Sequence, residues 1–476
     1  MRRKRSPRFI ATILFVRATR AFMRLLRRKG THFPGQLAKR LCPDFLSRIE
    51  PPDKIIAITG TNGKTTTANL VADVARGLDL DFAHNAYGSN IEEGIITTLL
   101  DATTLTGKKK KPLAILEVDE RLTRIIFKDI VPDIVLVTNL FRESYWRNGH
   151  SEFVFGILDE FIPKDCHVIV NADDLLSHQL ADRRSSTAFS IAPLPEEPPF
   201  THNLIRDVRL CPRCAHPLTD TFIRYHHMGR AHCDACGWTP IDADFTVISL
   251  DDLEDRPVRH DALLDARFMT VEGPDGVERY PFIGDNILDA YNELSAIALF
   301  RHLGYPVERI AGELARCTMG ASRKHIATIG DTTVIRMLAK AKNPISLTRV
   351  VRAILDRPGT KQFVLLIDCS TDTMSEEDNT AWLYDAELTL FDRPDVTRVI
   401  LGGKRSEDMH AALLLAGVPE SKLIVCRNEH DTARHIRTDD GPTTIAVLYE
   451  LYSYAAAQSV ADATEQALAE EIHHED

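Results

Sequence analysis

The chain has 476 residues, of which 44% are hydrophobic, and a formal net charge of −10 at pH 7 with a pI near 6.0. Because this length exceeds what one hydrophobic core ordinarily fills, we expect two or three domains. The acidic balance argues against a protein that generally coats nucleic acid. No apolar run approaches the roughly 20 residues that a membrane-spanning helix needs. Nine cysteines, four of them in two close pairs, suit a reducing compartment, so we expect a cytoplasmic protein.

The first 48 residues form a basic N-terminal arm. In a helix, one side would carry Leu14, Phe15, Ala18, Phe22 and Leu25, and the other side would carry five arginines: Arg17, Arg20, Arg24, Arg27 and Arg28. Such a basic amphipathic helix can rest on anionic lipid, as a peripheral contact at the inner face of the membrane. The alternative is a solvated helix that packs on its own domain. No small-residue cleavage site follows the apolar stretch, so export is not expected.

A phosphate loop lies between a predicted strand at residues 54–59 (KIIAIT) and a predicted helix at residues 66–78. The loop reads GTNGKTT. Its backbone amides can surround phosphate oxygens, its lysine can neutralise them, and a threonine hydroxyl can reach Mg²⁺. An ordinary glycine turn would not require the lysine and the hydroxyls. We therefore expect ATP to bind through Gly60, Thr61, Asn62, Gly63, Lys64, Thr65 and Thr66.

Short apolar strands alternate with helical patterns along most of the chain. Strands are predicted at residues 113–118, 134–138 and 168–171, which favours a mostly parallel, doubly wound α/β sheet. The alternation resumes after residue 325, indicating a separate C-terminal α/β domain. We predict a basic arm at residues 1–48, a central ATP-binding domain at 49–318 and a C-terminal domain at 319–476.

Four cysteines interrupt the central domain in the pattern C-x2-C, eighteen residues, C-x2-C. Four thiolates can close a tetrahedral shell around Zn²⁺ and leave no position for water, so the site is expected to be structural. A catalytic zinc would need that open position, and a redox pair would not need the duplicated spacing. Zinc ribbons also bind nucleic acid, but no other element of the chain supports that function. We predict a zinc ribbon at residues 205–242, with the ligands Cys211, Cys214, Cys233 and Cys236.

The GTNGKTT loop closely resembles that of the Mur ligases and of their folylpolyglutamate synthase relatives. These enzymes activate a carboxylate as an acyl phosphate and then form an amide. The resemblance implies a Mur ligase-type central P-loop ATPase domain. In residues 116–120 (LEVDE) it implies that Glu117 binds Mg²⁺ together with Thr65. In residues 291–296 (YNELSA) it implies that Asn292 approaches the nucleotide base, and at the start of the C-terminal domain Arg323 is expected to clamp phosphate.

A four-cysteine ribbon inserted into a Mur-type central domain resembles the MurT subunits of lipid II isoglutaminyl synthase. Residues 85–90 (NAYGSN), 171–174 (NADD) and 382–385 (WLYD) are similar to segments of that family. The resemblance implies ATP-dependent amidation of the D-glutamate α-carboxylate of lipid II to D-isoglutamine, with ammonia supplied by a GatD-type glutaminase subunit. It also implies an aspartate of this chain that completes the glutaminase triad, for which Asp378 and Asp385 are the two candidates.

Two segments depart from the family pattern. Residues 141–149 read FRESYWRNG where the family has FRDQLDRYG, and residues 322–325 read SRKH where the family has GRME. These departures leave two alternatives to a MurT-like synthetase. One is a Mur-type ligase that acts on a different carboxylate and amine, as in folate polyglutamylation. The other is a divergent nucleotide-binding partner subunit without full turnover.

Overall fold

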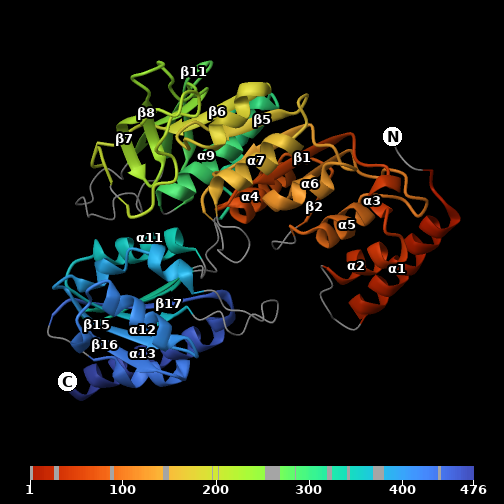
Figure 1. The fold of residues 1–476 in the computed structure, drawn as a ribbon. Helices are drawn as coiled ribbons and strands as arrows, with labels where there is room; N and C mark the ends of the chain where they lie inside the picture. The colour runs from red at the N-terminus through yellow and green to blue at the C-terminus, as the bar shows by residue number, and fades with distance from the viewer. Residues whose placement is uncertain are drawn as a thin grey trace.

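The computed structural model describes residues 4–25, 32–85, 90–142, 150–195, 197–201, 203–251, 268–284, 286–318, 324–339, 343–367, 380–437 and 441–475. Within these ranges the strands form a nine-stranded sheet, a six-stranded sheet and a two-stranded sheet. Figure 1 shows the two larger sheets in separate bodies, one built from the chain up to α10 (Val307–Leu314) and one from the C-terminal part that follows.

The nine-stranded sheet has the order β11-β10-β9-β6-β5-β4-β1-β3-β2. Its parallel strands are β1 (Lys54–Thr59), β2 (Phe82–His84), β3 (Leu113–Glu117), β4 (Ile134–Val137), β5 (His167–Asn171), β6 (Ser186–Ile191) and β9 (Phe245–Asp251). The edge strands β10 (Phe268–Gly273) and β11 (Gly276–Pro281) are antiparallel. Because β1 lies between β3 and β4, the carboxyl ends of these three strands meet at one edge.

Helices cover both faces of this sheet, which explains why its strands are apolar throughout. Ile56 and Ile58 face a core formed with α4 (Lys64–Gly77), α9 (Ile287–His302) and α10 (Val307–Leu314). Ile55 and Ala57 face the opposite core, to which α5 (Glu92–Asp101), α6 (Thr123–Ile126) and α7 (Ser151–Phe161) contribute. The N-terminal helices α1 (Pro7–Leu25), α2 (Phe33–Leu41) and α3 (Phe45–Arg48) pack into this second core, so the first 48 residues are joined to the body that carries β1.

The six-stranded sheet has the order β12-β13-β17-β14-β15-β16. Its strands are β12 (Lys324–Ile329), β13 (Thr332–Leu338), β14 (Thr360–Leu366), β15 (Val396–Gly402), β16 (Leu423–Cys426) and β17 (Thr443–Tyr449). Helices α11 (Pro344–Leu355) and α12 (Ser406–Leu415) contribute to the core on one face, and α13 (Tyr454–Glu475) packs on the other. No described helix is both long and apolar enough to cross a membrane.

Both larger sheets are mixed but mostly parallel, as the sequence predicts. Strands β10 and β11 are joined by a two-residue turn that reaches Gly276, and β12 and β13 by one that contains Gly330. Two residues can connect only antiparallel neighbours, whereas parallel neighbours need a crossover. The α/β class is therefore correct, and the antiparallel pairs are confined to one edge of each sheet.

A buried carboxyl group in α9 makes stability depend on pH. Glu293 is fully buried and accepts a hydrogen bond from the Ile283 amide at 3.1 Å. Burial raises its pKa from 4.5 to about 8. Between about pH 4.5 and about pH 8, the folded chain therefore keeps this proton, whereas the unfolded chain releases it. The contribution of Glu293 to stability is full below about pH 4.5 and is lost as the pH rises towards about 8.

We expect the Glu293→Gln variant to gain stability relative to the native chain between about pH 5 and about pH 8, because the amide does not titrate. The difference in free energy of unfolding between the variant and the native chain should change by up to about 1.4 kcal/mol per pH unit. Urea unfolding at several pH values measures it. Glu420→Gln, at a side chain that is 76% exposed, is the matched control. A difference between Glu293→Gln and the native chain that stays flat across this range contradicts the prediction.

Candidate nucleotide site and cysteine cluster

The loop after β1 lies tightly against two neighbouring elements. Gly60 and Gly63 have positive φ angles of 123° and 84°, a conformation that side chains rarely allow. A Cβ on Gly63 would lie 2.1 Å from the Oδ1 atom of Asn292 in α9, and one on Gly60 would lie 2.3 Å from the Thr138 hydroxyl. Both glycines are therefore required by close packing. The structure brings Asn292 to the loop that the sequence assigned to phosphate.

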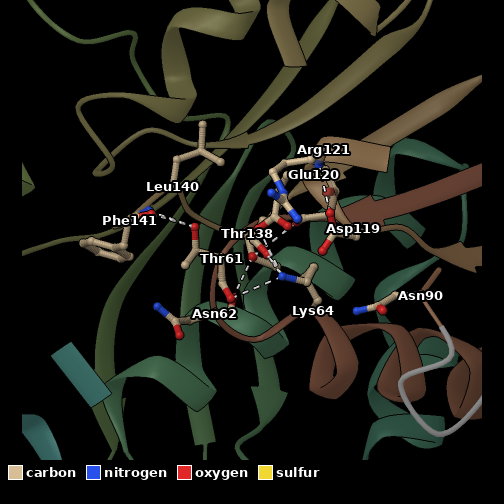
Figure 2. A network of polar contacts seen from close by, with 12 residues as sticks. Thr61, Asn62, Lys64, Asn90, Asp119, Glu120, Arg121, Thr138, Leu140 and Phe141 are labelled. Carbon is tan, nitrogen blue, oxygen red and sulfur yellow. Dashed lines mark hydrogen bonds and ion pairs between the residues drawn. The ribbon is translucent and has the colours of Figure 1, made fainter. Parts of the chain in front are cut away.

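The segment that follows β4 holds the loop by hydrogen bonds (Figure 2). The Thr61 amide donates to the Asn139 carbonyl at 2.8 Å, and the Asn62 amide donates to the Asn139 side chain at 3.0 Å. Asn139 Nδ2 and the Thr138 hydroxyl both donate to the Asn62 carbonyl, at 3.0 and 2.7 Å. The Phe141 amide donates to the Thr61 hydroxyl at 2.9 Å. Since the bonds run in both directions, the loop conformation is set before any ligand binds.

Lys64 begins α4, and its side chain is almost fully buried. Its ammonium lies 3.1 Å from Glu120 Oε1 and donates to the carbonyls of Gly60 and Thr61. The side chains of Lys64 and Glu120 are 9% and 2% exposed, so this is a buried ion pair. Sequence reasoning did not assign Glu120 a role. The available signal was the run of three carboxylates from Glu117 to Glu120, of which Glu120 is the last and begins the 3-10 turn after β3.

Thr65 and Glu117, the two residues predicted to hold Mg²⁺, lie together at the end of β3. The Thr65 hydroxyl donates to Glu117 Oε1 at 2.9 Å, and the Asn90 amide donates to the same oxygen at 3.2 Å. The backbone of Glu117 is paired in both directions with the Asn85 side chain, at 2.7 and 2.8 Å. A hydroxyl and a carboxylate are oxygen donors of the kind that Mg²⁺ prefers. Thr66, in the first turn of α4, is half-buried.

The C-terminal body reaches the loop through Asn343. Its Nδ2 donates to Asn62 Oδ1 at 3.0 Å, while its Oδ1 accepts from the Ser346 amide and caps α11. Asp385, one of the two predicted triad aspartates, lies 3.4 Å from the guanidinium of Arg142, which also pairs with the buried Asp207. The other predicted residues of this body, Asp378 and Arg323, lie outside the described residues, as does the divergent segment 143–149.

The 171–174 segment (NADD) connects the loop with the cysteine-bearing insertion. Asp174 accepts from the Leu140 amide at 2.6 Å, and its other oxygen lies 3.1 Å from the ring of His227. Burial alone would lower the pKa of His227, but its contact with Asp174 raises it, and the same contact lowers the pKa of Asp174. Asp173 accepts from the Tyr291 hydroxyl at 2.7 Å. A buried ion pair therefore joins the insertion to the segment that locks the loop.

The four cysteines of the insertion form one cluster, with all sulfur atoms within 4.8 Å of one another: Cys211, Cys214, Cys233 and Cys236. Two sulfur pairs are 3.5 Å apart. Four thiolates around one zinc at 2.3 Å would be about 3.8 Å apart, so the cluster has the right size. The two pairs also sit on equivalent turns, because Ala215 and Gly237 both have positive φ and donate to the first cysteine of their pair at 2.8 Å.

Three basic residues of the hairpin formed by β7 (Thr219–Tyr225) and β8 (Met228–His232) are directed into the protein, whereas His232 is partly exposed. Arg224 pairs with Glu197 at 2.7 Å, Arg230 lies 3.1 Å from Asp173, and His226 is buried. Charges that are paired inside the fold are not available to a phosphate backbone. The hairpin geometry therefore favours a structural role for the insertion over nucleic-acid binding.

Two family models match the chain. The Mur ligase middle domain matches residues 58–193, and the MurT ligase C-terminal domain matches residues 340–456. A curated relative from Staphylococcus aureus (strain COL), "Lipid II isoglutaminyl synthase (glutamine-hydrolyzing) subunit MurT", is 27% identical over 87% of this chain and 90% of its own length. The protein of the same name from Streptococcus pneumoniae (strain ATCC BAA-255 / R6) is 26% identical over 87% of this chain and 88% of its own length.

Solved structures share the fold. A pseudomurein peptide ligase type C from Methanothermus fervidus aligns with a TM-score of 0.63 over 89% of this chain and 81% of its own, at 16% identity. The MurF ligase from Thermotoga maritima in complex with ADP aligns with a TM-score of 0.57 over 92% of this chain and 85% of its own, at 14% identity. The predicted Mur ligase fold is confirmed. The chain thus carries a Mur ligase middle domain and a MurT ligase C-terminal domain, and it is similar to curated MurT subunits over most of its length.

Proposed function

We propose that this chain is the synthetase subunit of a lipid II isoglutaminyl synthase, which uses ATP to amidate the D-glutamate α-carboxylate of lipid II. The observation that carries the proposal is the set of side chains around the loop after β1, in a chain whose curated relatives bear that name over nearly their whole length. Lys64, Thr65 and Glu117 lie at one sheet edge, with Asn292 against the loop.

The reaction divides into two steps that suit this site. A carboxylate oxygen of the substrate attacks the γ-phosphorus of ATP, forming an acyl phosphate and releasing ADP. Ammonia then attacks the acyl carbon, the carbon–oxygen bond to phosphate breaks, and the nitrogen gives up a proton to leave the amide. Loop amides and the Lys64 ammonium would stabilise the negative charge that moves onto the phosphate oxygens in the first step. The loop needs no rearrangement for this, because Asn139 already holds it.

Thr65 and Glu117 are the residues we assign to hold Mg²⁺, which would neutralise phosphate charge when bound. Glu117 is 1% exposed and is held by Asn90, so its carboxylate is fixed towards the loop. We assign Glu120 a different role. Its pair with Lys64 holds the ammonium near the loop, and phosphate oxygens would compete with Glu120 for that ammonium.

Ammonia would come from a GatD-type glutaminase partner, and an aspartate of this chain would orient the partner's histidine. Asp385 already contacts Arg142, which is itself tied to Asp207. We therefore assign Asp385 to positioning Arg142 between the two bodies, and Asp378 to the triad. We also propose that the domains are divided at about residues 48 and 318, as the sequence indicates, with the ribbon at 205–242 and a structural zinc on its four cysteines.

Replacing the loop lysine should abolish the reaction. We expect Lys64→Ala to lower ATP-dependent amidation of lipid II by at least about 100-fold with either glutamine or ammonium as the nitrogen source, because the phosphate charge is no longer neutralised. Mass spectrometry of the stem peptide measures it. Lys111→Ala, which removes a surface lysine paired with Asp81, should leave the rate unchanged. A native complex that binds ATP yet amidates nothing would disprove the assigned reaction.

Variants of the two aspartates should differ in how their amidation rates depend on the nitrogen source. We expect Asp378→Asn to lose amidation with glutamine and keep it with ammonium, because only glutaminase activation fails. Asp385→Asn should lose rate with both sources, because Arg142 loses a contact from the C-terminal body. Rates with each source at saturating ATP measure this. The reverse pattern, a loss restricted to glutamine in Asp385→Asn, would assign the triad to Asp385 instead.

Loss of zinc should unfold the insertion. We expect about one zinc per chain by elemental analysis, and we expect Cys214→Ser with Cys236→Ser to lose it and to lower the free energy of unfolding by at least about 3 kcal/mol. Cys317→Ser, at a half-buried cysteine outside the cluster, is the control and should keep the metal. Metal-free protein with unchanged stability would show that the cluster is not a zinc site.

A further inference from the structure

Helix α1 leaves one apolar face uncovered in the described part of the chain. Leu14, Phe15 and Phe22 are 48%, 56% and 60% exposed. Together with three exposed alanines they recur at helical spacing, so that one continuous apolar face runs along the helix: Ala11, Leu14, Phe15, Ala18, Ala21 and Phe22. Figure 1 shows α1 at the outer edge of the N-terminal body, with no helix or strand beyond it.

The opposite side of α1 fixes the rotation of the helix. Phe9, Ile13 and Val16 are at most 1% exposed, and the Phe9 ring packs 5.0 Å from the ring of Phe45. Gly107 also lies against Phe9, since a Cβ on it would come within 2.5 Å of the ring. A helix with this well-packed core side cannot roll to bury the other face. The uncovered face is therefore a stable surface of the fold.

Arginines of α1 fasten the helix to the protein. Arg17 donates to the carbonyls of Leu100 and Thr103 at the end of α5, and Arg20 pairs with Asp101. Arg8 donates to the carbonyl of Leu41, the last residue of α2, at 2.6 Å. Cations at the carboxyl ends of helices are favourable, because carbonyl groups there have no partner within the helix. These arginines of α1 thus make contacts within the protein, and the apolar face of the helix is directed outward.

The charge of the N-terminal segment indicates what covers the stripe. The first 30 residues contain eleven Lys and Arg and no Asp or Glu, although the whole chain has a net charge of −10. Basic residues lie on both sides of the stripe in sequence, in MRRKR before it and in RLLRRK after it. A partner that presents an apolar layer beneath an anionic surface matches this pattern, and an anionic lipid bilayer is such a partner.

We propose that the face of α1 from Ala11 to Phe22 is a membrane-docking surface, which seats in the plane of an anionic phospholipid bilayer. Phe15 and Phe22 would enter the boundary between headgroups and acyl chains. The proposal rests on α1 alone and does not depend on the reaction assigned above. If that reaction is correct, docking would also place the enzyme at the surface where a lipid-linked substrate lies.

Vesicle flotation with the full chain tests the proposal. Vesicles of phosphatidylcholine alone are compared with vesicles that contain phosphatidylglycerol, for the native chain and for Phe15→Glu with Phe22→Glu. We expect the native chain to bind the anionic vesicles, and we expect salt to weaken this binding. The affinity of the double variant for the same vesicles should be lower by at least about tenfold. Val277→Glu with Leu415→Glu, at side chains 68% and 77% exposed elsewhere, should bind as the native chain does.

Docking would be overturned if the native chain did not bind anionic vesicles, or if the Phe15→Glu, Phe22→Glu variant bound them equally well. It would also be overturned if the native chain sedimented as a dimer without binding vesicles and this variant sedimented as a monomer. The last result would assign the stripe to a second copy of the chain. Melting temperature and ATP affinity show that the variant is folded. Should it be destabilised, Phe15→Gln with Phe22→Gln gives the same readout without added charge.

Discussion

The clamp between Asn62 and Asn139 is the constraint on which the nucleotide site depends. Each residue donates to the other, and both hydrogen bonds lie where the carboxyl ends of β1 and β4 meet. A glycine-containing loop has many conformations in isolation, so fixing one of them costs entropy. This entropy is lost when the sheet folds, because Asn139 follows a buried strand and fixes the loop as that strand packs. Nucleotide binding then begins from a loop that already has its shape.

The clamp also links regions that are far apart in sequence. The residue after Asn139, Leu140, donates its amide to Asp174, and Asp174 contacts His227 in the hairpin of the insertion. Burying charges costs several kcal/mol unless they are paired, so removal of one partner would leave the other uncompensated. The insertion is consequently part of the support of the nucleotide site. The cysteine cluster thus lies in an insertion that also contacts the segment holding the nucleotide loop.

Much of this organisation follows from sequence. The strand, loop and helix around residues 54–78 carry a buried apolar run, glycines and helical spacing, and Glu117 ends a second such strand. The partner of Lys64 was missed, because nothing local tells Glu120 from a surface acid until the fold buries it. For α1, the helical wheel found the stripe and the arginines, but only tertiary packing shows that Phe9, Ile13 and Val16 form the buried side. The role of Asp174 likewise depends on a hairpin fifty residues away.

Contacts between the two bodies are mostly polar, and this has a consequence for motion. Asn343 meets Asn62, Arg142 meets Asp385, and Glu387 accepts from Asn203 and the Leu204 amide, while Ile345 is a rare apolar contribution to the first body. Such groups recover their hydrogen bonds from water when they separate, so each costs only about 1 kcal/mol to part. The two bodies should therefore hinge apart readily, without any unfolding of either core.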